Sequence, residues 1–206
     1  MYALVTNNEI TKLINNPKAM VIGDVQYPAK IFSIWSASEL NNIGIYEVVF
    51  DDSNKKDEKW YINTNQSYDF DGNEVTATYG SATAKAHADT TWTQEDIDDL
   101  DDAGDLTAGD IKTRGLKYNL IRDLKITVAN ILSETDWYIT RNTEKSTAIP
   151  SAISTHRDAV RTKQAEMETA ITNASDTPAL ETLYTYTTDD DGVQSRPLGE
   201  LPTLES

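Results

Sequence analysis

The second half of the chain carries two apolar stripes with helical spacing, and these constrain the fold most strongly. The second stripe begins just after Pro150, a residue favoured at the first position of a helix. The short connection between the stripes predicts an antiparallel αα-hairpin within residues 111–175. The first stripe comprises Leu116, Leu120, Leu124, Val128, Ile131 and Leu132, and the second comprises Ile153, Val160, Met167 and Ile171.

A Thr-Asp-Trp sequence directly follows the first of these predicted helices, and a polar loop follows it. We expect Trp137 to close the open end of the hairpin. A tryptophan at such a place is either packed in a core, as most large aromatic residues are, or in contact with a partner. Both interpretations stay open on the sequence alone.

Residues 1–80 predict a small, mostly antiparallel β module with one short helix. Apolar runs alternate with the turn signals Asn7-Asn8 and Asp71-Gly72, which favour β-hairpins. The spacing from Ser36 to Glu39 is that of a capping box and predicts a short helix directly after Ser36. Together with the helical hairpin, this module makes the expected fold class α+β.

Composition changes twice outside these two regions. Residues 81–110 are mostly small or acidic, with nine acids and no base from Asp89 to Asp110, and predict a linker or a weakly held helix over 93–100. Residues 176–206 predict a short helix and a flexible polar tail, extended until a partner orders it.

Charge is unevenly distributed along the chain, whose net charge is −16. Residues 1–110 hold 20 acids against 7 lysines, whereas residues 111–163 hold 10 bases against 5 acids. The net charge argues against nucleic acid as a partner, because such binding requires cations that neutralise phosphates. The basic region could instead dock on the acidic segment or on an acidic neighbour, with Arg157 and Arg161 as candidate contacts, or it could be a solvated helix face.

Several other function classes lack their sequence signals. No window of about 18 apolar residues exists, so we expect no membrane span. The chain has no cysteine, no Gly-x-Ser-x-Gly sequence and no phosphate-binding glycine loop. We therefore expect a protein that is not an enzyme and has no cofactor. A carboxylate hydrolase acting on polysaccharide would rest on the number of acids alone, which singles out none of them.

The acidic segment contains an incomplete frame of an EF-hand calcium loop over residues 99–110, reading DLDDAGDLTAGD. Ala103 removes the ligand at position five, and an aspartate replaces the usual glutamate at position twelve. A calcium-responsive binding module is thus an alternative to a solvated acidic stretch. Its candidate ligands are Asp99, Asp101, Asp105 and Asp110.

Aromatic residues dominate protein interfaces, although they also dominate cores. Trp92 lies in a polar, acidic stretch that offers little for it to pack against. We therefore select Trp92 as a candidate partner-binding residue, together with Trp137.

Two stretches resemble bacteriophage tail proteins. The C-terminal one resembles the helical region of tail-fibre assembly proteins and related small tail proteins, and the N-terminal one resembles a module of many uncharacterised phage tail reading frames. The first is carried by Thr135-Asp136-Trp137, Arg141, Glu144, Ile149-Pro150, Arg157 and Ala159-Val160-Arg161. The second is carried by Tyr2-Ala3-Leu4-Val5, Ile22-Gly23-Asp24-Val25, Tyr27-Pro28-Ala29, Trp35-Ser36, Glu39-Leu40 and Ile43-Gly44-Ile45-Tyr46.

This resemblance implies a non-catalytic tail protein, a fibre-associated structural component or assembly factor of the host-recognition apparatus that acts by protein–protein docking. It implies tail or tail-fibre proteins as partners in an oligomeric assembly. The implied location is the host cytoplasm during assembly and then the virion tail. The alternative is a transient tail-fibre chaperone that is absent from the virion. The resemblance transfers no active-site residues.

Overall fold

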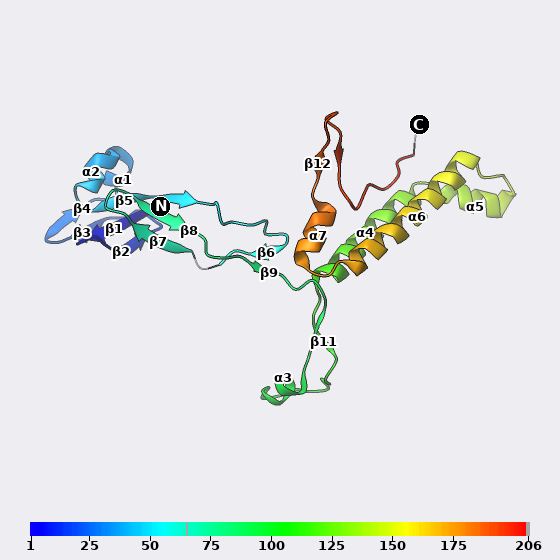
Figure 1. The fold of residues 1–206 in the computed structure, drawn as a ribbon, viewed down its shortest axis with the longest axis horizontal. Coiled ribbons are helices and arrows are strands. Elements are labelled where there is room, and N and C mark those ends of the chain that lie inside the picture. Colours follow the sequence, from blue (N-terminus) through cyan, green and yellow to red (C-terminus); the bar gives the residue numbers. More distant parts are fainter. Residues whose placement is uncertain (65, 205–206) are drawn as a thin grey trace. The chain divides into compact units, whose positions relative to one another are not determined.

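The computed structural model describes residues 1–64 and 66–204, and its fold class is mixed α+β (Figure 1). The chain divides into two compact units, Met1–Thr83 and Ala84–Ser206. Most of the acidic segment that the sequence predicted as a linker therefore belongs to the second unit. Each unit is described by itself below.

The first unit is built on a five-stranded sheet with the strand order β2-β1-β5-β8-β7. All neighbouring strands are antiparallel except β5 and β8, which are parallel. The edge strands β2 and β7 contact each other, so the sheet is curled. The strands are β1 (Tyr2–Thr6), β2 (Glu9–Ile14), β5 (Ile45–Asp51), β7 (Ser67–Phe70) and β8 (Val75–Thr78).

Both hairpins predicted in this unit are present. Asn7 and Asn8 have positive φ angles of 54° and 65° and join β1 to β2, as a two-residue hairpin turn requires. Gly72 has a φ of 102° in the turn between β7 and β8. In β2, Thr11 forms a bulge, because Leu4 pairs with Lys12 whereas the next residue of β1 pairs with Ile10.

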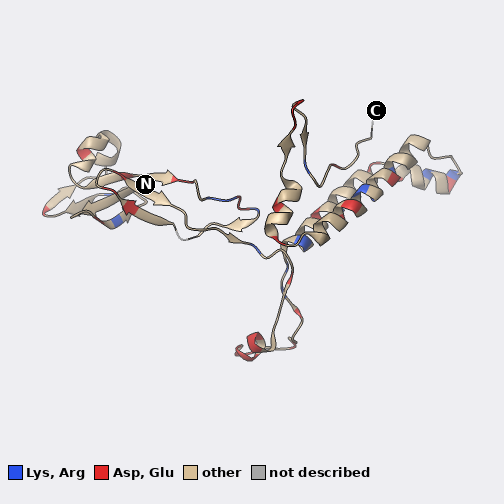
Figure 2. Cartoon of the chain, viewed as in Figure 1, with Lys and Arg blue, Asp and Glu red and all other residues tan. Residues whose placement is uncertain are grey.

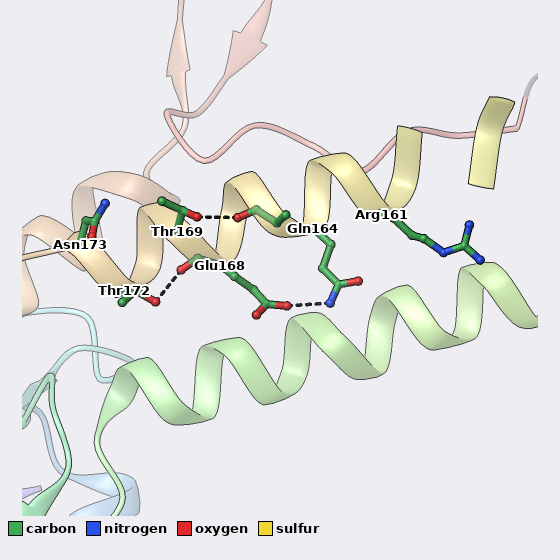
Figure 3. A pocket seen from close by; sticks show the side chains of 7 residues that line it. Arg161, Gln164, Glu168, Thr169, Thr172 and Asn173 are labelled. Carbon is green, nitrogen blue, oxygen red and sulfur yellow. Dashed lines mark hydrogen bonds between the residues drawn. The ribbon is translucent and has the colours of Figure 1, made fainter. Parts of the chain in front are cut away.

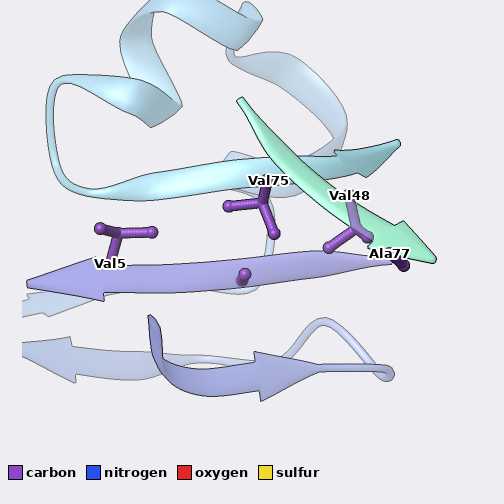
Figure 4. Packing of buried hydrophobic residues seen from close by; sticks show 5 residues of the cluster. Val5, Val48, Val75 and Ala77 are labelled. Carbon is purple, nitrogen blue, oxygen red and sulfur yellow. The ribbon is translucent and has the colours of Figure 1, made fainter. Parts of the chain in front are cut away.

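The sheet buries a hydrophobic cluster on each face, because residues alternate between the two faces along β1. One cluster contains Ala3 of β1 and the residues labelled in Figure 4, which are Val5, Val48, Val75 and Ala77. The other packs Tyr2 and Leu4 of β1 against Ile31, Leu40 and Ile45.

Two short helices supply part of the second cluster. The capping box of Ser36 and Glu39 begins α2 (Ala37–Asn41), as the sequence predicted. Helix α1 (Ile31–Ile34) was not predicted, because its sequence carries no capping signal. Among the described residues, no side chain caps its first turn. Two small ribbons complete the unit, one of β3 (Met20–Ile22) with β4 (Val25–Tyr27) and one of β6 (Tyr61–Ile62) with β9 (Thr83–Ala84).

Near its start, the second unit has an arm of residues 89–114, here called the acidic arm (Figure 2). It consists of β10 (Thr90–Thr91), helix α3 (Gln94–Asp98) and β11 (Ile111–Thr113), with β10 and β11 paired antiparallel. A capping box of Thr93 and Asp96 begins α3. The segment predicted as a linker is therefore folded. Its short helix lies within residues 93–100, where the sequence allowed a weakly held helix.

Four helices follow the acidic arm, and α4 and α6 lie side by side (Figure 1). Residues early in α4 contact residues late in α6, so the two helices are antiparallel. Lys117 donates to the carbonyl of Thr172, and Lys125 forms an ion pair with Glu168 at 3.3 Å. The helices are α4 (Leu116–Ser133), α5 (Asp136–Lys145), α6 (Ser151–Asn173) and α7 (Thr177–Tyr184).

The chain after α7 folds back instead of forming the extended tail that the sequence predicted. Strands β12 (Thr187–Thr188) and β13 (Gln194–Ser195) form a hairpin. Leu198 is buried, and its backbone N–H donates to the carbonyl of Leu183 at 3.0 Å. Leu198 and Arg196, whose guanidinium lies 5.5 Å from the ring centroid of Tyr184, therefore anchor this segment on α7.

Candidate protein-docking site

The junction of α4, α5 and α6 is held by the guanidinium group of Arg157. Its Nη1 donates to the carbonyl of Leu132 and to Oγ1 of Thr135, both at 2.6 Å, and its Nη2 donates to the carboxylate of Asp136 at 2.9 Å. We call these contacts the Arg157 clamp. Arg157 is only 7 % exposed. This position corrects the prediction that Arg157 binds a partner, because its donors are used inside the unit.

The clamp assigns structural roles to the first two residues of the Thr-Asp-Trp sequence. The hydroxyl of Thr135 is buried and also donates to the carbonyl of Leu132 at 3.0 Å, which caps the end of α4. Asp136 is the first residue of α5 and places its negative charge at that helix N-terminus. The clamp therefore fixes where α5 begins and leaves Trp137 outside it.

Helix α5 presents an aromatic surface to solvent. All ten of its residues are described, and none is buried. Trp137 is 50 % exposed, its ring centroid lies 3.7 Å from that of Tyr138, and the guanidinium of Arg141 lies 5.7 Å from the Trp137 ring. Ile139 of the same helix is also exposed. We call these four residues the α5 surface. Because half of the Trp137 surface is exposed, the interpretation of this residue as a core tryptophan is wrong.

Trp92, the other tryptophan selected from the sequence, is half-buried within the acidic arm. Its backbone N–H donates to the carbonyl of Asp110 at 2.8 Å, and Nζ of Lys112 lies 4.6 Å from its ring centroid. The same ammonium group pairs with Asp96. Hydrogen bonds from Lys112 and then from Thr93 lower the pKa of Asp96 to about 2. Trp92 thus packs against the basic strand that closes its own arm.

The base of the acidic arm is closed by Asp89. Its carboxylate accepts a hydrogen bond from the backbone N–H of Gly115 at 2.8 Å and forms an ion pair with Arg114 at 2.6 Å. These two interactions, in that order, lower the pKa of Asp89 below its ordinary value. Part of the positive charge predicted as a docking surface is therefore paired with the arm itself.

The structure does not bring the four candidate calcium ligands together. Asp99 is the C-cap residue directly after α3, whereas the carboxylate of Asp110 accepts hydrogen bonds from the backbone N–H and the hydroxyl of Thr107. Asp101 and Asp105 lie in the loop between them. Over the described residues, no three acidic or histidine side chains gather where they could hold a metal ion.

Two open hollows lie along α4 and α6. The hollow on α6, about 510 Å³, contains Arg161, which is half-exposed and forms an ion pair with Asp158 at 3.3 Å. In Figure 3, the side chain of Gln164 donates to Glu168 beside it. The remaining lining residues of this hollow are Ala165, Thr169, Thr172 and Asn173.

The hollow on α4, about 480 Å³, is mainly apolar, and sequence reasoning missed it. Its residues recur at intervals of three and four, which is the spacing of one helix face. That spacing was a usable signal, but these residues lie beside the stronger leucine stripe of the same helix. The lining residues are Tyr118, Ile121, Arg122, Lys125, Ile126 and Ala129.

Comparisons with protein-family models, with curated proteins and with solved structures give no match to this chain. Among the helices in the described part of the chain, none is both long and apolar enough to cross a membrane.

Proposed function

We propose that the chain is a non-catalytic bacteriophage tail protein, a fibre-associated component or assembly factor of the host-recognition apparatus that works by protein–protein docking. The observation that carries this proposal is the α5 surface, a clamped helix that exposes Trp137. The resemblance of the Thr-Asp-Trp region and of the N-terminal stretch to phage tail proteins supplies the biological context. The expected location is the host cytoplasm during assembly and then the virion tail.

The energetics of α5 support docking as its role. A ten-residue helix is marginal in water on its own, and α5 gains little from burial because each of its described residues is at least partly exposed. The Arg157 clamp holds its first turn in place. Tryptophan, tyrosine and arginine are the residue types that most often carry binding energy in protein interfaces, and α5 presents Trp137, Tyr138 and Arg141 together.

A pull-down from infected host cells tests the role of the α5 surface. We expect Trp137→Ala to reduce capture of a tail or fibre protein at least about tenfold, since truncation of a central aromatic contact costs more than about 1.4 kcal/mol. Phe50→Ala is the matched control, because Phe50 is also 50 % exposed but lies in the first unit. Failure of the unaltered protein to capture any tail or fibre protein would refute the proposal.

The alternative function within this proposal is a transient tail-fibre chaperone. Mass spectrometry of purified virions separates the two, because a structural component is retained at a fixed copy number. A chaperone is captured by fibre protein in infected cells but is absent from finished particles.

A further inference from the structure

We infer that the exposed side of the α4 and α6 pair binds a second copy of this chain, forming a four-helix bundle. The opposite side of the pair is covered within the same chain. There, Leu180 of α7 and Leu198 are buried, and Gly199 lies against the side chain of Lys163 on α6. Of the two sides, the one with the hollows is left open to solvent. The inference does not depend on the proposed phage function.

The two hollows form one continuous surface, here called the open face. Lys125 lines the hollow on α4, Glu168 lines the hollow on α6, and these two side chains form the ion pair between the helices. The open face therefore spans both helices, and this ion pair joins its two halves.

The α4 half and the α6 half of the open face differ in the size of their side chains, so side chains of one copy can fill the hollow of another. The α4 half carries large exposed side chains, with Ile126 54 % exposed and Tyr118 beside the same hollow. The hollow of the α6 half contains the small side chains of Ala165 and Thr169, together with longer polar side chains such as Gln164. A two-fold axis parallel to the helices places α4 of each copy against α6 of the other, so that large residues face small ones twice.

Charge favours this arrangement over its alternative. The α4 half carries Arg122 and Lys125, both exposed, so packing α4 against α4 would bring like charges together. Packing α4 against α6 instead brings these cations near Glu168, the acid that pairs with Lys125 of its own chain. Arg161 lies near the middle of α6, about two helical turns from Glu168.

The open face is large enough for a specific dimer. An 18-residue helix such as α4 is about 27 Å long, and two packed helices are roughly 20 Å wide. The projected area is therefore on the order of 500 Å² on each copy, or about 1,000 Å² in total, which is the lower limit for a specific interface. A second copy would also complete the two-layer packing that a lone helix pair leaves open on this side.

Sedimentation velocity of the full chain over a wide concentration range tests the dimer. We expect the unaltered protein to shift from monomer to twice the monomer mass, and Ile126→Glu to weaken the dimer at least about tenfold, because it buries a charge in the interface. Ile34→Glu is the control, since Ile34 is 62 % exposed on a helix of the first unit. A monomer at the highest concentration, a larger oligomer, or an equally strong Ile126→Glu dimer would overturn the inference.

Cysteine cross-linking tests the geometry without relying on a destabilising variant. The chain has no cysteine, so single introduced cysteines report only on their own positions. Ala129→Cys on α4, carrying an affinity tag, is mixed with untagged Ala165→Cys on α6. We expect the mixed disulfide to exceed both self-linked products. Predominance of the Ala129→Cys self-linked product would place α4 against α4 and overturn the proposed arrangement.

Discussion

Arg157 is a charged residue that is buried although it lies in a polar stretch of sequence. It lies four residues after Ile153 and three before Val160, so it shares the buried face of α6 with them. This spacing was readable from the sequence. Its partners were not, because the carbonyl of Leu132 and the hydroxyl of Thr135 become acceptors only once α4 ends beside α6.

Replacement of Arg157 by lysine should destabilise the protein by about 2–3 kcal/mol, because one ammonium group cannot reach all three acceptors of the planar guanidinium group. Arg161→Lys, on the exposed side of the same helix, should change the free energy of unfolding by less than about 0.5 kcal/mol. Urea denaturation followed by circular dichroism measures both. Equal midpoints for the two variants would show that the Arg157 clamp contributes little.

Elements were predictable where a local signal specifies them. The capping box at Ser36, the Asn7-Asn8 turn and the two apolar stripes each act within a few residues, and each has its counterpart in the structure. Helix α5 and the parallel pairing of β5 with β8 were missed. They depend on contacts between distant residues, as in Val48 opposite Val75.

The candidate site was also predictable only in part. The sequence selected Trp137, but its exposure follows from the Arg157 clamp, which fixes the start of α5. The fold of the acidic arm was unpredictable for a related reason. Its nine acids suggest disorder, whereas bases that follow in sequence, Lys112 and Arg114, pair with Asp96 and Asp89.

The acidic arm should therefore lose structure in acid. The pKa of Asp96 is about 2 in the folded arm, below its ordinary value of 3.8, so its stabilising effect is complete above pH ~3.8 and is lost as the pH falls toward 2. The indole N–H resonance of Trp92, assigned with Trp92→Phe, should move over this range.

A matched pair of variants checks this assignment. Asp96→Asn should produce the shifted Trp92 resonance already at neutral pH, because an amide cannot form the ion pair with Lys112. Asp101→Asn removes a carboxylate from the loop of the same arm and should leave the resonance in place. Identical spectra for the two variants would exclude Asp96 as the cause.

At the scale of the whole molecule, two units with their own cores should fold separately. The first unit buries Ile45 and Val75, and the second buries Val160, Ile171 and Leu180. Fragments 1–84 and 85–206, cut so that β9 stays whole, should each give the backbone amide spectrum of the intact chain, apart from residues near the cut. A collapsed spectrum for either fragment would mean that its folding requires the other unit.

The bulge at Thr11 has a consequence for chains that accumulate at high local concentration. Exposed sheet edges can recruit strands from neighbouring molecules and grow into cross-β aggregates. Edge strand β2 is interrupted by this bulge, carries Lys12 next to it, and curls toward β7. At high concentration, these features of β2 should disfavour amyloid-like growth from this edge of the sheet.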